Sequence, residues 1–210
     1  MLDPGHNGGN AAHPAQVDRR VPDGRGGMKA CNTTGTAARN GYPEHEFNWD
    51  VASRVRDALS ARGFTVIMTR TDDSGVGPCV DERAAIGNRG NAAAVVSIHA
   101  DGAPGPNSHG FHIAYSAPPL NTAQGEPSVR LATILRDGFT AAGFIPSTYV
   151  GSHGLDPRSD LSGLNLSERP TALVECGNMH HPGDAALLES PDGRARIATV
   201  IATAITGYLG

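Results

Sequence analysis

Short apolar runs alternate with longer amphipathic segments along most of this chain, and this alternation constrains its fold more than any other feature. The runs are rich in β-branched residues and short enough to be buried strands. They cover residues 64–70 (FTVIMTR), 93–99 (AAVVSIH), 110–116 (GFHIAYS) and 170–177 (PTALVECG). The opening residues MLD resemble a further strand that is nearly complete.

Helical segments separate these runs. Apolar spacing predicts helices over residues 42–63 and 127–142, a shorter one over 81–90, and a last one from Pro191. Strands that alternate with helices of this length are typical of a mainly parallel sheet. We therefore predict a single α/β domain over residues 1–210. Its twisted sheet has about five to six strands, with helices on both faces.

The helix over residues 42–63 has an apolar stripe that includes Phe47, Val51 and Val55. At about 100° per residue, Glu44 falls in the middle of this stripe, whereas Glu46 lies about 200° away on the polar face. The helix phase therefore directs Glu44 towards the interior and Glu46 towards solvent.

Composition excludes several classes of partner. The formal net charge is −4 and the basic residues are scattered, so neither nucleic acid nor an anionic membrane surface is indicated. No apolar run approaches the ~20 residues that a membrane span needs. Because the chain opens close to the end of a strand, we expect further residues, including a signal peptide, to precede it in the full protein.

The three cysteines allow two interpretations. Cys31 and Cys79 lie in segments rich in Gly, Pro and Asn, whereas Cys176 ends an apolar run. All three could be free thiols, but we favour a Cys31–Cys79 disulfide, which would place the protein outside the cytoplasm. Cys31 belongs to a loop over residues 7–43, and loops of this length are usually functional.

Four residues suggest a metal-dependent active site. His6, His99 and Glu175 each follow or end a predicted strand, and Glu44 opens the long helix. In open α/β sheets, ligands collect beyond the carboxyl ends of the strands. Two histidines and a glutamate are suitable ligands for a catalytic zinc, and a further carboxylate could act as its general base. Spacing alone leaves a structural role open, because the chain has 9 histidines and a histidine at a strand end is more often structural.

Motifs along the whole chain narrow these alternatives. In order, they are LDPGH at 2–6, Glu44 with Asn48, Thr69 to Asp72, VVSIHAD at 95–101, GFHIAY at 110–115 and RPTALVECGN at 169–178. In this order and spacing, they resemble the zinc-dependent N-acetylmuramoyl-L-alanine amidases of type 3, which act in bacterial cell division and autolysis. The resemblance covers nearly the whole chain, although the loop over residues 7–43 is longer than the family typically has.

This resemblance implies a role for each of the four residues. His6, Glu44 and His99 would bind zinc, and Glu175 would be the catalytic carboxylate. The expected substrate is peptidoglycan or a muropeptide, cut between N-acetylmuramic acid and L-alanine outside the cytoplasm by a monomeric enzyme. Two alternatives remain: another zinc peptidase or carboxypeptidase of the cell wall, and a wall-binding relative without activity.

Overall fold

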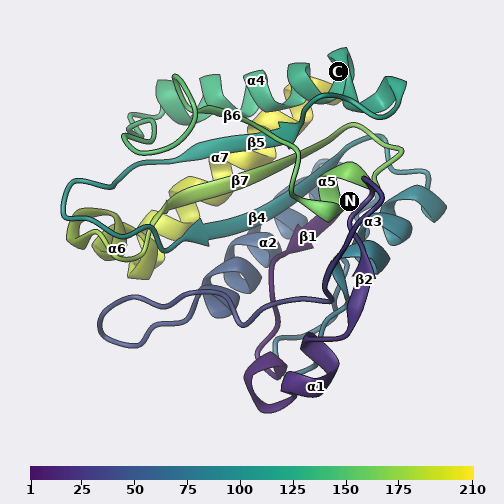
Figure 1. Cartoon of the computed structure of the whole chain (residues 1–210). Helices are drawn as coiled ribbons and strands as arrows, with labels where there is room; N and C mark the ends of the chain where they lie inside the picture. Colours follow the sequence, from purple (N-terminus) through teal and green to yellow (C-terminus); the bar gives the residue numbers. More distant parts are fainter.

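The central sheet has five strands in the order β1-β4-β7-β5-β6, in a computed structural model that describes every residue from 1 to 210 (Figure 1). The strands are β1 (Leu2–Pro4), β4 (Val95–Asp101), β5 (His112–Ser116), β6 (Leu155–Arg158) and β7 (Thr171–Asn178). β1, β4 and β7 are mutually parallel, whereas β5 runs antiparallel to β7 and pairs in parallel with β6. The predicted α/β domain with a mainly parallel sheet of five to six strands is confirmed.

Seven α-helices surround this sheet, and none has the length and apolar character needed to span a bilayer. They are α1 (Pro14–Val17), α2 (Glu44–Ser60), α3 (Val80–Arg89), α4 (Glu126–Ala141), α5 (Ser162–Asn165), α6 (Pro182–Glu189) and α7 (Pro191–Leu209). In Figure 1, α2 and α7 lie behind the sheet and α4 runs along its upper edge. Two short 3-10 helices, η1 (Asn10–Ala12) and η2 (Thr122–Gln124), complete the helical elements.

The two faces of the sheet differ because side chains alternate along each strand. Leu2, Val96 and Val174 belong to the main hydrophobic core, together with buried residues of α2, α4 and α7. The opposite face carries Asp3 and Ser97, and α3 and α5 pack on this side. The predicted helices on both faces are therefore present. The smaller helices leave part of the polar face free for a site.

The prediction of a strand over residues 64–70 is wrong. This segment runs beside β1, but only Met68 forms a bridge with it, and the pairing does not extend into a ladder. Leu2 donates to the Ile67 carbonyl and accepts from the Thr69 N–H. The next β1 residue on this side is Pro4, which has no N–H, so the pairing with residues 64–70 ends there, although β1 forms a ladder with β4 on its other side.

Residues 144–170 have no periodic apolar pattern, yet they contain two short elements. β6 forms an edge strand that includes Pro157, a position where the missing N–H costs no ladder hydrogen bond. α5 follows it and has four residues. Elements this short have no recognisable sequence periodicity, so tertiary packing determines whether they form.

The long segment over residues 7–43 is folded rather than open. It contains η1, α1 and a two-stranded antiparallel hairpin of β2 (Arg20–Pro22) and β3 (Met28–Ala30). Cys31, directly after β3, forms a disulfide with Cys79, as predicted, and Cys176 is free and buried. The disulfide packs with Val21 and Val80 in a small apolar cluster of its own, apart from the main core.

Removing this disulfide is expected to destabilise the fold. The bridge joins residues 48 positions apart. Constraint of the unfolded chain by a loop of that size contributes about 4 kcal/mol in the chain-entropy model. Urea unfolding of Cys31→Ala/Cys79→Ala should therefore show a lower free energy of unfolding than the wild type. A loss below about 1 kcal/mol would contradict this expectation.

Candidate active site

The carboxyl ends of the parallel strands bring three of the four predicted site residues to one edge of the sheet. His99 and Glu175 are register partners on β4 and β7, so their side chains lie side by side on the same face. β1 ends level with Ile98, and the Gly5 N–H donates to the Ile98 carbonyl at 3.0 Å. His6 therefore leaves β1 next to His99, and the two imidazole rings meet edge to face at 5.0 Å.

Glu44 reaches the same point from the start of α2. It is 4% exposed, whereas Glu46 is exposed, so the helix phase predicted from the apolar stripe is confirmed. The Thr36 N–H donates to Glu44 Oε2 at 3.0 Å, and the Asn48 side-chain amide donates to Glu44 Oε1 at 3.2 Å. Asn48 also donates to the Gly5 carbonyl at 3.2 Å, which ties the helix to the segment that carries His6.

His6, Glu44 and His99 form a compact cluster of nitrogen and oxygen atoms. Glu44 Oε2 lies 3.1 Å from His6 Nε2, and Glu44 Oε1 lies 2.9 Å from His99 Nδ1. All three ligand atoms lie within 4.8 Å of one another. Two histidines and one carboxylate that leave a further position open are the ligand set of a catalytic zinc. The residues present therefore fit zinc.

The charge state of Glu44 suits a metal ligand. Its burial opposes ionisation, but the charges and hydrogen bonds of His6 and His99 outweigh burial and hold the pKa of Glu44 well below its usual range. The carboxylate consequently stays ionised at neutral pH. A bound cation would also offset the burial of the Glu44 carboxylate and keep it ionised, even with both imidazoles neutral.

Glu175 lies in the same cleft as this cluster. Together with the three cluster residues, it lines a cleft of about 360 Å³. Its Oε2 is buried and has no hydrogen-bond partner. Burial, followed by the negative charges of Glu44 and Asp101, raises the pKa of Glu175 well above its usual value. A carboxylate with an unused oxygen and a raised pKa is suited to accepting and returning a proton.

Two buried arginines also shape the site, and the sequence did not reveal their role. Arg83 donates to the carbonyls of Pro4 and His6, each at 2.7 Å. Arg70 donates to the Pro4 carbonyl at 3.0 Å and to the Gly5 carbonyl at 3.3 Å. Both side chains therefore fix the backbone that presents His6. Arg83 is also ion-paired with Asp3, and Arg70 with Asp73, but the main-chain carbonyls that both arginines bind leave no local signal in the sequence.

Asp101 lies in the same cleft as Glu175 and is paired with Tyr149. The Tyr149 hydroxyl donates to Asp101 Oδ2 at 2.9 Å. His112 is the register partner of Glu175 on β5 and is 2% exposed, which agrees with a structural role for it. Tyr149 comes from a segment without regular structure, so no periodic signal could have placed it there.

The close approach of the His99 ring explains why residue 5, directly before His6, is a glycine. A Cβ at this position would lie 2.1 Å from His99 Cε1, so the two ligand-bearing segments can approach only if residue 5 has no side chain. Gly5→Ala is therefore expected to displace the His99 ring and lower zinc affinity at least ~10-fold, the scale of a disturbed outer shell. Zinc titration against a chromophoric chelator measures this.

Gly207→Ala in α7 provides the control for Gly5→Ala. Apart from its own helix backbone, no atom lies within 4 Å of the added Cβ, so this variant should bind zinc like the wild type. If Gly5→Ala bound zinc with wild-type affinity, the site would tolerate a side chain at residue 5 against the His99 ring, contrary to this prediction.

Comparison with known proteins agrees with this geometry. The family model described as N-acetylmuramoyl-L-alanine amidase matches residues 1–207. The chain belongs to the N-acetylmuramoyl-L-alanine amidase family. It is 49% identical over 209 residues to the N-acetylmuramoyl-L-alanine amidase Rv3717 of Mycobacterium tuberculosis, covering 100% of this chain and 85% of that protein. The resemblance drawn from the sequence motifs is confirmed.

Solved structures of amidases share the fold. The amidase Ami1 of Mycobacterium smegmatis matches with a TM-score of 0.96 and 55% identity, covering 100% of this chain and 95% of that one. The amidase AmiC2 of Nostoc punctiforme matches with a TM-score of 0.74 and 25% identity, covering 99% and 94%. The fold shared with these amidases therefore extends over nearly the whole of this chain.

Proposed function

We propose that this chain is a zinc-dependent amidase that cleaves peptidoglycan between the lactyl group of N-acetylmuramic acid and the L-alanine of the stem peptide. One observation carries the proposal: the compact cluster of His6, Glu44 and His99 lines the same cleft as Glu175, a carboxylate with an unpartnered oxygen. The family to which the chain belongs supports this choice of amide bond.

His6 Nε2, His99 Nδ1 and the Glu44 carboxylate would hold the zinc. Zinc in such a site supplies two things, a lowered pKa of water and polarisation of a carbonyl oxygen. The Glu175 carboxylate would accept the proton of the attacking water and then deliver it to the nitrogen of L-alanine as the amide bond breaks. The hydroxyl adds to the lactyl carbonyl carbon, so the products are a free lactyl carboxylate and a stem peptide with a free amino terminus.

The segment over residues 7–43 would form part of the cleft wall, because Gly35 and Thr36 line the cleft beside the metal ligands. Peptidoglycan lies outside the cytoplasm, and a Cys31–Cys79 disulfide persists in oxidising compartments. We therefore propose extracytoplasmic action. The proposed ligands His6, Glu44 and His99 and the catalytic Glu175 are complete within one chain, so we also propose that the active form is a monomer.

Digestion of a purified disaccharide tetrapeptide, followed by mass spectrometry, tests the choice of bond. The proposal requires an intact tetrapeptide that begins with free L-alanine, together with a disaccharide that carries the free lactyl carboxylate. Loss of only the terminal residue would identify a carboxypeptidase instead. An unchanged substrate in the presence of bound zinc would identify a wall-binding relative without activity.

A further inference from the structure

The Cys31–Cys79 disulfide joins two loops that meet beside His6. The loops are residues 31–33, directly after β3, and residues 77–80, which lead into α3. Besides the disulfide, the Val80 N–H donates to the Cys31 carbonyl at 2.7 Å, and the Asn32 side chain donates to the Pro78 carbonyl at 2.9 Å. The two loops are therefore fastened to each other at three points.

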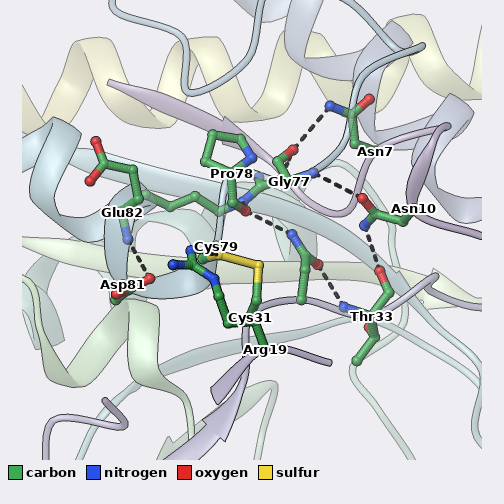
Figure 2. The surroundings of a disulfide bond; sticks show 12 residues. Asn7, Asn10, Arg19, Cys31, Thr33, Gly77, Pro78, Cys79, Asp81 and Glu82 are labelled. Carbon is green, nitrogen blue, oxygen red and sulfur yellow. Dashed lines mark hydrogen bonds between the residues drawn. A yellow bond between two sulfur atoms is a disulfide. The ribbon is translucent and has the colours of Figure 1, made fainter. Parts of the chain in front are cut away.

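Asn10 fastens the same two loops from a third segment. Its Nδ2 donates to the Thr33 carbonyl at 2.7 Å, and its Oδ1 accepts from the Gly77 N–H at 2.9 Å. Figure 2 shows Asn10 between Thr33 and Gly77, with the disulfide on the other side of the paired loops. Asn10 is 1% exposed, so neither hydrogen bond competes with bulk water.

The Thr33 carbonyl held in this way contacts a proposed zinc ligand. It lies 3.1 Å from His6 Nδ1, while His6 Nε2 faces Glu44. A carbonyl that accepts from one ring nitrogen fixes the tautomer and the ring orientation, and leaves the other nitrogen as the metal ligand. Thr33 also places its hydroxyl 3.2 Å from His6 Nδ1.

The backbone of His6 depends on the second loop. His6 has a φ of 57°, in the left-handed region that a residue with a side chain rarely adopts. Such a conformation persists only where the surroundings hold it. Arg83 does so by donating to the His6 carbonyl at 2.7 Å, and it also donates to the Gly77 carbonyl at 3.1 Å and to the Pro78 carbonyl at 2.9 Å. Ring and backbone of His6 are thus each fixed to one of the two bridged loops.

We infer that the Cys31–Cys79 disulfide is a positioning element of the metal centre, which keeps the Thr33 carbonyl and Arg83 in place around His6. The inference rests on the proposed zinc site. It differs from a purely stabilising role, in which the disulfide would raise the free energy of unfolding and leave zinc affinity unchanged. The two roles are separable, because zinc affinity can be measured where every variant is almost fully folded.

The test compares zinc dissociation constants of the wild type, Cys31→Ala/Cys79→Ala and Asn10→Ala, by competition with a chromophoric chelator. Alanine is used because free thiolates could themselves bind zinc. The measurement is made at a temperature where circular dichroism shows more than about 99% folded protein, so that unfolding cannot weaken apparent binding. The double variant should bind zinc at least ~10-fold more weakly, and Asn10→Ala, with its disulfide intact, at least roughly 3-fold more weakly.

Asn88→Ala is the matched control. Its side chain also makes two main-chain hydrogen bonds, one donated to the Leu166 carbonyl and one accepted from the Glu168 N–H, but these tie α3 to residues 166–168 and involve neither bridged loop. It should bind zinc within about twofold of the wild type, since the outer shell of the metal is untouched. Weakening in Asn88→Ala equal to that in Asn10→Ala would overturn the inference.

Zinc affinity of the double variant within twofold of the wild type would also overturn the inference and leave the disulfide with a stabilising role alone. If the double variant does not fold, Asn10→Ala decides, and unchanged affinity there overturns the inference. A wild-type chain that binds no zinc would instead overturn the proposed function. That outcome is therefore distinguishable from failure of the positioning role.

Discussion

Glu175→Gln is expected to lower the turnover of muropeptide at least ~100-fold, because a positioned acid or base typically contributes 10²–10⁴-fold. Glutamine has nearly the same shape and can still accept a hydrogen bond, but it cannot take a proton from water and return it to the leaving nitrogen. Glu175 is not a member of the ligand cluster, so the variant should retain zinc. Kinetics on a purified muropeptide, with elemental analysis of the same preparation, measure both properties.

Stability serves as the control for Glu175→Gln. The carboxylate lies in a buried position that disfavours its charge, so the neutral amide should not weaken the fold. If the variant has the free energy of unfolding and the zinc content of the wild type but little activity, the lost activity is due to lost proton transfer. Near-normal turnover would show that Glu175 is not the catalytic carboxylate.

Glu44→Ala is expected to lose most of its zinc and, with it, nearly all activity. The substitution removes the only carboxylate of the ligand cluster and leaves two histidines, which are too few for a catalytic zinc site. It also removes the acceptor that both His6 Nε2 and His99 Nδ1 face, so the two rings lose their common partner. Elemental analysis of the purified variant gives its zinc content directly.

Glu46→Ala is the matched control, two residues further along the same helix. Glu46 is exposed and touches neither histidine of the cluster. Its removal should change the free energy of unfolding by no more than about 0.5 kcal/mol and leave zinc content and activity nearly normal. The assignment of Glu44 as the ligand would be wrong if Glu46→Ala were the variant that loses zinc.

The sequence predicted the part of the site that depends on long, regular elements. The apolar stripe of α2 has helical spacing, so it indicated the side of the helix on which Glu44 lies. The strands β4 and β7 are recognisable as apolar runs, so the sequence predicted that His99 and Glu175, at their carboxyl ends, lie together. In α2, β4 and β7, local periodicity and tertiary packing favour the same structure.

Other parts of the structure depend on partners that no local pattern reveals. The run at residues 64–70 has strand composition, but Pro4 in the neighbouring β1 has no N–H with which to extend the pairing beyond Leu2. The role of Arg83 depends on carbonyl groups far away in the sequence, and that of Thr33 depends on a main-chain oxygen, which every residue has. Composition allowed the Cys31–Cys79 disulfide, but it could not show that the bridge lies beside a metal ligand.

The central claim is that zinc held by His6, Glu44 and His99, together with Glu175, hydrolyses the amide between N-acetylmuramic acid and L-alanine. The most direct measurement removes metal from the purified chain with a chelator, verifies by circular dichroism that the fold remains, and adds zinc in steps while mass spectrometry follows a muropeptide. We predict no turnover in the metal-free chain, and release of a stem peptide beginning with L-alanine that reaches its plateau at one zinc per chain. Full turnover without metal, or zinc-dependent cleavage of a different bond, would contradict this account.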